Sequence, residues 1–316
     1  MKKYKFRKPK NYRKMFLDLE EKIKKIVPTA KVEHIGSTSI PGLGGKGLID
    51  VLIIIKKPLL PEVKKILLKK LILKKMLLET IKNKFFLSSK IRKFNKEGKN
   101  KLLVIGDSHS EVFLNENIIN ALKEYQLNVV SIGGATVSGL ANPNSKTNAK
   151  KVFEYSLKKI KPKTLISLLG EVDTGFLIWH KAEHSKLSIN EIYKNTLNKY
   201  QDFIINNMRK NKISKIIIIS APLPTIKKYS LNNEVGNIRS KIKATYEQRK
   251  KLTMKFNEDL FNFCKKKKFI FLDLTNDVID KNNNIKQEFF SNSPFDHHYK
   301  KEVYSKLIIE KLKKLL

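Results

Sequence analysis

Two short polar segments of this sequence carry side chains that can do nucleophilic chemistry. The first, Gly106-Asp107-Ser108-His109-Ser110, directly follows an apolar run at 102–105. The second, 293–300, reads SPFDHHYK and holds an aspartate and two adjacent histidines near the end of the printed sequence. Together, serine, histidine and aspartate can supply a nucleophile, a general base and a carboxylate that orients the base.

Ser108 stands where a buried strand would give way to a helix. Its Oγ would project above the sheet, beside N–H groups of a helix N-terminus that favour developing negative charge. On this interpretation His298 takes the proton of Ser108 and Asp296 holds the imidazole, with His297 as the alternative base. Gly-Asp-Ser is also ordinary turn and helix-cap chemistry, and the histidine pair could simply be solvated before the last helix.

Strands and helices alternate from residue 101 onward. Near-continuous apolar runs predict strands at 102–105, 127–132, 164–169, 215–220 and 269–272. Helices are predicted at about 110–124, 146–161, 189–210, 244–267 and 301–315. Such runs are typical of a sheet covered on both faces, so we predict an α/β three-layer sandwich with a five-stranded parallel sheet. Ligands in such sheets bind beyond the carboxyl ends of the strands, where Ser108 lies.

With these motifs, residues 101–316 resemble the SGNH/GDSL hydrolase superfamily of esterases and acyl hydrolases. The resemblance implies a flavodoxin-like fold in which Ser108 is the nucleophile. It assigns the orienting carboxylate to Asp296 and the base to His298 or His297. It further implies an ester substrate, either a small molecule or a carbohydrate, and no cofactor.

The same resemblance places two more loops at the site. It implies that the backbone N–H groups of Ser108 and Gly134 stabilise the oxyanion. The family's third motif has a donating asparagine where this chain has Val172, so one oxyanion donor is replaced. We expect the flanking carboxylates of Glu171 and Asp173 to hold backbone amides of the loops.

The first part of the chain has a different organisation. Helical spacing predicts a helix at 12–27, and an apolar run predicts a strand at 48–55. A Lys/Leu/Ile helix is expected at 62–82, and the polar stretch 94–101 marks a domain boundary. We therefore expect a small α+β module at 1–95 followed by the larger domain at 100–316.

Residues 4–55 resemble the GrpB family of the nucleotidyltransferase superfamily, through the stretch EHIGSTSIPGLGGKGLID at 33–50. In that superfamily a Gly-Ser turn cradles phosphate and carboxylates on the next strand hold Mg²⁺. The resemblance implies nucleotide binding through Gly36, Ser37, Lys46 and Asp50. Leu52 stands where a second carboxylate would be needed, so the module is interpreted as partial, with Mg²⁺ only if it is active.

The charge balance is strongly basic. The chain has 66 Lys and Arg against 29 Asp and Glu, a formal charge of +37. Arginine, the residue suited to bidentate phosphate and base contacts, occurs only at positions 7, 13, 92, 209, 239 and 249. We therefore do not expect nucleic acid as the functional partner, although non-specific attraction to polyanions remains.

The remaining residue signals concern compartment and metal. The single cysteine, Cys264, fits a reducing compartment, and no apolar segment follows the basic N-terminus, so a cytoplasmic protein with no membrane association is expected. The apolar run 51–55 is too short to span a bilayer. His180 and His184 have the spacing of a metal pair on a helix, but no third ligand stands nearby, and no metal site is predicted.

These observations favour a serine esterase or acyl hydrolase, such as a deacetylase, with a partial nucleotidyltransferase-like module in front. Two alternatives stay open. One is GrpB-like nucleotidyl transfer or nucleotide binding. The other is a non-catalytic binding protein with an SGNH-like fold and a weakened oxyanion site.

Overall fold

The structure is a computed structural model. It describes residues 12–26, 28–29, 31–35, 50–54, 90–95, 100–142, 144–227, 239–240, 242–293 and 296–316. The chain divides into two compact units, Met1–Lys84 and Phe85–Leu316. The division falls before the polar stretch 94–101, because strand β3 (Arg92–Phe94) pairs with strand β5 (Tyr125–Ser131) of the second unit.

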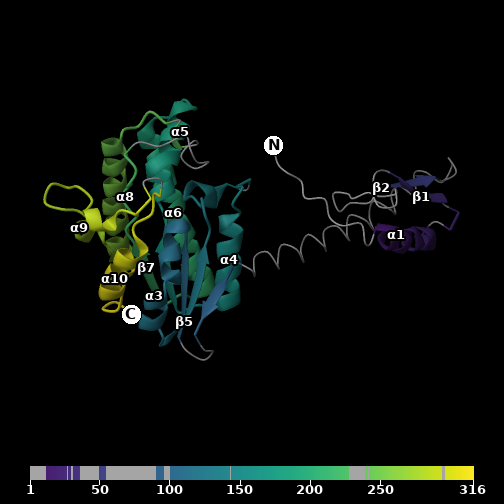
Figure 1. Ribbon diagram of the computed structural model, residues 1–316, viewed down its shortest axis with the longest axis horizontal. Helices are drawn as coiled ribbons and strands as arrows, with labels where there is room; N and C mark the ends of the chain where they lie inside the picture. Colours follow the sequence, from purple (N-terminus) through teal and green to yellow (C-terminus); the bar gives the residue numbers. More distant parts are fainter. Residues whose placement is uncertain are drawn as a thin grey trace. The chain divides into compact units, whose positions relative to one another are not determined.

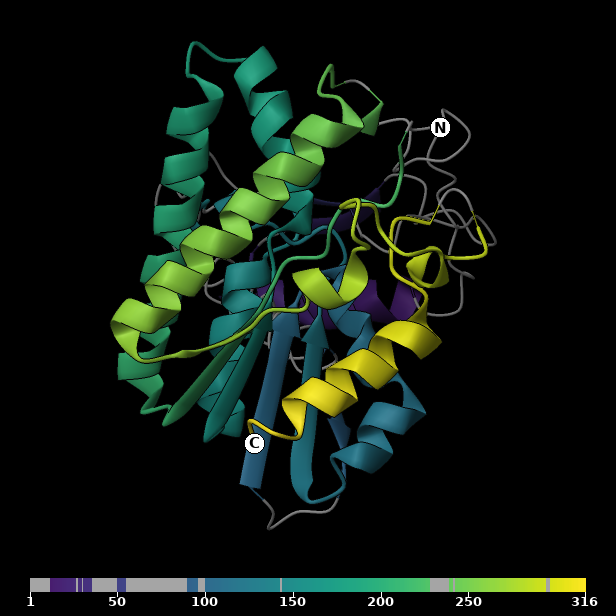
Figure 2. The ribbon, with the colours of Figure 1, turned by 90° about the vertical axis from the view of Figure 1, so that its left-hand side faces the viewer.

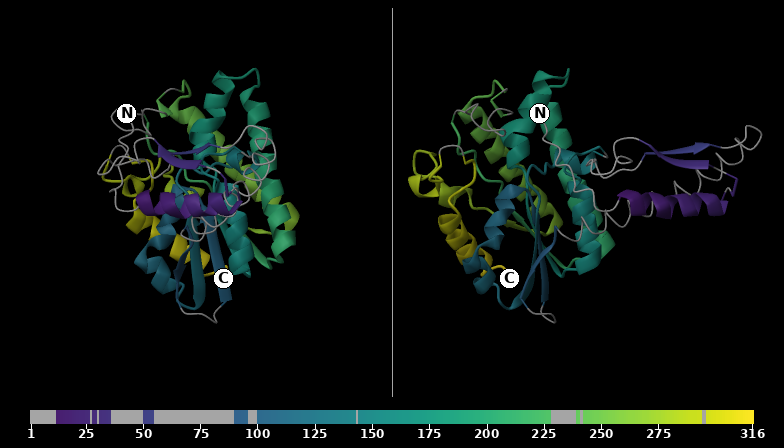
Figure 3. Two further views of the ribbon diagram at one scale, coloured as in Figure 1. Left: turned by 90° about the vertical axis from the view of Figure 1, so that its right-hand side faces the viewer. Right: turned by 45° about the vertical axis from the view of Figure 1, so that its right-hand side comes forward.

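The first unit contains one helix and a two-stranded sheet among its described residues. Helix α1 (Tyr12–Ile26) confirms the helix predicted at 12–27. Strands β1 (Lys31–Ile35) and β2 (Asp50–Ile54) pair antiparallel, as Figure 3 shows beside α1. The helix predicted at 62–82 lies outside the described residues.

The second unit is built on a six-stranded sheet. Its strands lie in the order β3-β5-β4-β6-β7-β8. Besides β3 and β5, they are β4 (Asn100–Gly106), β6 (Thr164–Leu168), β7 (Lys215–Ile219) and β8 (Ile270–Leu272). All neighbours pair parallel except β3 and β5, so the prediction of five parallel strands is right and the antiparallel edge strand was not foreseen.

The strand order fixes where a ligand can bind. Numbered along the chain, the parallel strands lie in the order 2-1-3-4-5, because the chain adds β5 on one side of β4 and then β6, β7 and β8 on the other. This is the flavodoxin-like doubly wound order. Its switch point is the crevice between the carboxyl ends of β4 and β6, and Ser108 follows β4 directly.

Helices cover both faces of the sheet, as Figures 1 and 2 show. One face carries α4 (Ala149–Ile160), α6 (Ile189–Asn211) and α8 (Tyr246–Lys267); the other carries α3 (Glu116–Ala121), α9 (Thr275–Val278) and α10 (Lys301–Leu312). Side chains along β4 alternate between the two buried clusters, with Leu103 and Ile105 on the first face and Leu102 and Val104 on the second. The three-layer prediction is therefore confirmed.

Local sequence signals explain where the long helices begin. Ser188 and Glu191 form a reciprocal capping box at the start of α6, and Thr245 and Gln248 form one at the start of α8. The helix predicted at 110–124 is instead broken at Asn115, which caps α3 after a 3₁₀ helix, η3 (Ser108–Leu114). Among the described helices, none is both long and apolar enough to cross a bilayer.

Candidate active site

The turn after β4 presents Ser108 through a tightly packed backbone. At Gly106 an added Cβ would lie 2.5 Å from the carbonyl oxygen of Leu168, so only glycine fits where β4 and β6 approach. Asp107 is buried, and its side chain accepts a hydrogen bond from the backbone N–H of His109 at 2.9 Å, capping η3. The hydroxyl of Ser110 donates to the carbonyl of Asp107 at 2.7 Å. These contacts fix the backbone on both sides of Ser108.

The segment before α10 brings Asp296 and His298 to that turn from 190 residues away. His298 Nε2 lies 2.8 Å from Ser108 Oγ, and His298 Nδ1 lies 2.6 Å from Asp296 Oδ1. Asp296 also accepts from the backbone N–H of His298 at 3.0 Å. The structure thus brings together the three residues that the sequence analysis singled out as nucleophile, base and orienting carboxylate.

The hydrogen bonds define the tautomer of His298. The Asp296 carboxylate can only accept, so Nδ1 carries the proton and Nε2 is free to accept from the Ser108 hydroxyl. Burial lowers the pKa of His298, and His109 nearby lowers it further, although Asp296 opposes both. Burial alone would raise the pKa of Asp296, but the hydrogen bonds from His298 hold it below its usual value. Both effects keep the imidazole neutral and the carboxylate ionised near neutral pH.

Gly134 lies in the loop after β5. The ends of β4 and β5 are paired, with Gly106 opposite Ser131, so the residues following the two strands are neighbours. Gly134 is exposed and has φ +70°, a left-handed conformation that side chains disfavour. Within the described part of the chain, the backbone N–H groups of Ser108 and Gly134 have no hydrogen-bond acceptor. Both are available to an oxyanion.

Val172 and Asp173 lie in the helical segment that follows β6. Asp173 accepts hydrogen bonds from the backbone N–H groups of Val137 at 2.6 Å and Ser138 at 3.0 Å, so it does hold the loop after β5. Burial raises the pKa of Asp173 to about 6. Val172 is buried and has no polar group to offer.

Glu171 has a different partner from the one expected. Instead of loop amides, its carboxylate binds Arg239 through two hydrogen bonds, Nη1 to Oε1 at 2.7 Å and Nη2 to Oε2 at 2.9 Å. Both side chains are buried, and the guanidinium holds the pKa of Glu171 far below its usual value despite the burial. Sequence reasoning missed Arg239, because nothing in the sequence around it points to a site; its only signal was the scarcity of arginine.

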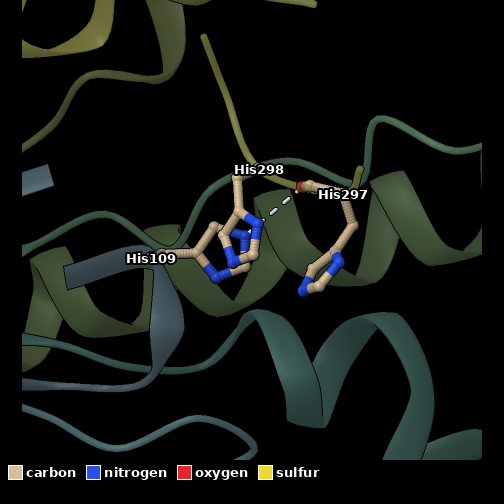
Figure 4. A group of neighbouring side chains, drawn as sticks. All are labelled: His109, His297 and His298. Carbon is tan, nitrogen blue, oxygen red and sulfur yellow. Dashed lines mark hydrogen bonds between the residues drawn. The ribbon is translucent and has the colours of Figure 1, made fainter. Parts of the chain in front are cut away.

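His109 and His297 lie against His298, as Figure 4 shows. His109 is buried, with Nδ1 3.1 Å from Asp107 Oδ1 and Nε2 3.4 Å from the carbonyl oxygen of His297. Burial disfavours a charge on His109, but Asp107 and Glu171 outweigh it and raise its pKa. Burial lowers the pKa of His297 to about 3. No role for His109 was predicted from the sequence.

The three histidines have ring nitrogens close enough to hold a metal ion, all within 4.8 Å of one another. Both nitrogens of His109 and of His298 already face protein partners, however. A metal ion would have to displace the contact between His298 and Ser108. His180 and His184 stack on each other at 4.3 Å and do not belong to this group of described ligands.

Two hollows are lined by candidate site residues. One, of about 320 Å³, is lined by Ser108, Asp296 and His298, with Lys300 and Lys301 among its other residues. The second, of about 620 Å³, begins at Gly134. Its lining combines the apolar residues Ala141 and Leu177 with polar residues, which are Thr136, Ser138, Asn142, Asn144, Ser145, Lys146, Thr147, Lys181 and Lys199.

The candidate nucleotide-binding residues of the first unit are only partly placed. Gly36, Ser37 and Lys46 lie outside the described residues. Asp50 is the first residue of β2 and stands opposite Ile35 of β1. Their roles stay predictions.

Comparison with known families confirms the resemblance in the first part of the chain. The family model described as GrpB protein matches residues 7–112. The match is longer than the 4–55 stretch on which the resemblance was based, and it continues through β4 into η3. It covers less than half of the chain. Among curated proteins, no relative matches the sequence.

Solved structures similar to the chain include GDSL-type and acetyl-ester enzymes. A GDSL-like lipase from Bacteroides thetaiotaomicron is 14% identical, with TM-score 0.46, over 68% of this chain and 87% of that one. A carbohydrate acetylesterase, Est24, from Sinorhizobium meliloti is 15% identical, with TM-score 0.47, over 69% and 100%. The periplasmic domain of a lipopolysaccharide acetyltransferase from Salmonella Paratyphi A is 16% identical, with TM-score 0.46, over 70% and 84%. The geometry around Ser108 is therefore the basis for proposing a reaction.

Proposed function

We propose that the second unit is a serine esterase or acyl hydrolase. The observation that carries the proposal is the continuous hydrogen-bonded chain from Ser108 Oγ through His298 to Asp296, with contacts of 2.8 and 2.6 Å. A nucleophile bonded to a base that is itself oriented by a carboxylate is the arrangement that activates a serine hydroxyl. Its place at the switch point of the sheet supports the same conclusion.

The proposed reaction has two steps. His298 Nε2 accepts the proton as Ser108 Oγ attacks the ester carbonyl, and the N–H groups of Ser108 and Gly134 stabilise the resulting oxyanion. His298 then gives its proton to the departing alkoxide, which leaves an acyl group on Ser108. Water, deprotonated by His298, attacks this acyl-enzyme, and collapse of the second tetrahedral intermediate returns the proton to Ser108. Asp296 stabilises the imidazolium throughout.

The lining of the hollow at Gly134 supports a polar substrate. Hydroxyl, amide and ammonium groups form part of this surface, and they can donate to the hydroxyl groups and ring oxygens of a sugar. We therefore propose a small-molecule or carbohydrate ester as substrate. We propose no cofactor for this reaction, since every step uses a group of the chain or water.

Turnover of a small aryl acetate tests the proposal. The wild-type protein should hydrolyse the ester and react with a fluorophosphonate at Ser108, whereas Ser108→Ala should do neither. A non-catalytic binding protein would show no labelling of Ser108. Equal rates for the two proteins would mean that Ser108 is not the nucleophile.

The family match of the first part of the chain favours a second candidate, nucleotide binding by a GrpB-like module. We propose that this module does not transfer nucleotides, because Leu52 stands where a second metal-binding carboxylate is needed. Incubation with labelled nucleoside triphosphates and Mg²⁺ should give no transfer product. Leu52→Asp should strengthen Mg²⁺ binding, and robust transfer by the unmodified protein would contradict the proposal.

A further inference from the structure

The site contains the same local motif twice. In both Asp107-Ser108-His109 and Asp296-His297-His298, an aspartate accepts from the histidine two residues later. The aspartate Oδ1 binds that histidine's backbone N–H, at 2.9 Å in the first turn and 3.0 Å in the second. The same oxygen binds the ring Nδ1, at 3.1 and 2.6 Å. Each turn therefore aims the Nε2 of its histidine away from its own aspartate.

The two turns are interlocked through their middle residues. His298 Nε2 of the second turn contacts Ser108, the middle residue of the first. His109 Nε2 of the first turn faces the carbonyl of His297, the middle residue of the second, along the dashed line in Figure 4. A carbonyl oxygen can only accept, so this contact requires a proton on His109 Nε2.

The first turn is hydrogen-bonded directly to residues of the sheet, whereas the second is followed by Tyr299, which is buried and accepts from the backbone N–H of Leu223 at 2.7 Å. The N–H of Asp107 donates to the carbonyl of Leu168 in β6, and the hydroxyl of Ser131 donates to the carbonyl of Asp107 at 2.8 Å. The second turn is tied by local contacts, such as the hydroxyl of Ser291 donating to Asp296 at 3.1 Å. Within the described residues, its only hydrogen bonds to a distant part of the chain are those with Ser108 and His109.

We propose that His109 is a positioning residue, which ties the carbonyl of His297 to the buried Asp107 and so sets His298 Nε2 against Ser108 Oγ. The catalytic consequence rests on the proposed esterase function. The hydrogen-bonded link from the His297 carbonyl through His109 to Asp107, called the tie below, does not. Without the tie, the reacting contact with Ser108 would be the only hydrogen bond that joins the second turn to the first among the described residues. Misplacement of a base by about 1 Å can cost on the order of 10²-fold in rate.

Two variants of His109 distinguish its hydrogen bond to the His297 carbonyl from a role in packing alone. His109→Asn keeps a donor at the position of Nδ1, facing Asp107, but is too short to reach the carbonyl of His297. His109→Gln extends a donor to the position of Nε2 and can reach it. On the aryl acetate, His109→Asn should lower kcat by roughly 10²-fold with KM within about threefold, and His109→Gln should recover most of kcat. His184→Gln, a change at an exposed histidine away from the site, serves as the control for handling.

The proposal would be overturned if His109→Asn and His109→Gln lowered kcat equally and in step with their losses in melting temperature. Wild-type kcat in both variants would overturn it as well.

The pH dependence of kcat/KM gives a further readout, through the position of its acid limb. The groups that face His298 are Asp296, His109, His297 and Glu171. Loss of the positive charge of His109 should raise the pKa of His298 and move that limb to higher pH.

A second measurement does not depend on turnover. The proton on His298 Nδ1, held by Asp296, should give a downfield proton NMR signal that Asp296→Asn removes. His109→Asn should broaden this signal by exchange with water, and His109→Gln should retain it. A sharp signal in both variants would overturn the tie even if the wild-type protein proved inactive on esters. Wild-type turnover that is absent while the signal responds as stated would instead contradict only the esterase function.

Discussion

The turns Asp107-Ser108-His109 and Asp296-His297-His298 share spacing and hydrogen bonds but differ in burial. The side chains of His109 and Asp107 are 2% and 1% exposed, whereas those of His298 and Asp296 are 28% and 40% exposed. The buried pair faces a carbonyl that cannot react, and the open pair faces a hydroxyl beside a hollow. Under the proposed function, burial and the identity of the partner distinguish the positioning role of His109 from the chemical role of His298.

The turns Asp107-Ser108-His109 and Asp296-His297-His298 are called the buried turn and the open turn below. The largest expected effect comes from removing the histidine base of the open turn. His298→Ala should lower kcat on the aryl acetate by roughly 10⁴-fold, because members of such a triad act as a unit. The free energy of unfolding should change by only about 0.5 kcal/mol, since the ring is partly exposed. His297→Ala, which keeps the backbone carbonyl, should lower kcat by less than about tenfold. The opposite ranking of the two histidines would reassign the base.

The two aspartates give the sharpest direct comparison. Asp296→Asn should lower kcat by roughly 10³-fold or more with little loss of stability, because the amide no longer stabilises the imidazolium. Asp107→Asn should mainly lower the free energy of unfolding, by about 1–3 kcal/mol, because its buried partners lose a charged acceptor. Kinetics and urea unfolding on both variants check this.

The contrast between the two turns would be contradicted if Asp107→Asn and Asp296→Asn had the same effects on kcat and stability. A kcat loss in Asp107→Asn as large as that in Asp296→Asn, with unchanged stability, would give the buried pair a direct chemical role. A large stability loss in Asp296→Asn would show that the open turn also holds the fold.

The sequence predicted the open turn but not the buried one. Ser108, Asp296 and His298 were accessible because their residue types match known chemistry and because strand ends mark the site. His109 stands two residues after Asp107, the same spacing as His298 after Asp296, so a usable signal was present. Its role could not be predicted because it depends on a contact with a carbonyl 188 residues away.

As with the site, only part of the fold could be predicted from the sequence. Buried parallel strands are apolar on both faces, so the runs at 102–105 and 215–220 were plain, and β4 and β7 confirm them. Strand β3 has only three residues, RKF, and no periodicity to detect. The ion pair of Glu171 with Arg239 joins residues 68 apart, so local patterns carry no trace of it.

A smaller effect is expected from adding an oxyanion donor while both turns stay intact. Val172→Asn should raise kcat by roughly tenfold, because a side-chain amide would join the N–H groups of Ser108 and Gly134. KM should stay nearly constant, since the added bond strengthens mainly in the transition state. The melting temperature and kcat should be measured on the same protein. A lower melting temperature without a gain in rate would mean that Val172 serves packing only.

The smallest expected effect is a pH dependence of stability that distinguishes the two turns. The groups that face His109 are Asp107, Glu171, Arg239, His297 and His298, and together with burial they leave its pKa above the ordinary value of 6.5. A folded-state pKa above the unfolded one contributes stability that is fully present below the unfolded pKa. That contribution is lost as pH rises through the folded pKa. His109→Gln should therefore cost more unfolding free energy at about pH 5.5 than at about pH 8.5.

Activity should move the other way over the same range. The pKa of His298 is lowered, so the acid limb of kcat/KM should lie below the ordinary histidine value, and activity falls only when pH drops through it. A lower pH thus strengthens the interactions of His109 in the buried turn, while it protonates His298, the base in the open turn. Urea unfolding of wild type and His109→Gln at both pH values, beside the wild-type pH–rate profile, measures the two trends. An equal cost of His109→Gln at both pH values would contradict a raised pKa of His109 in the folded protein.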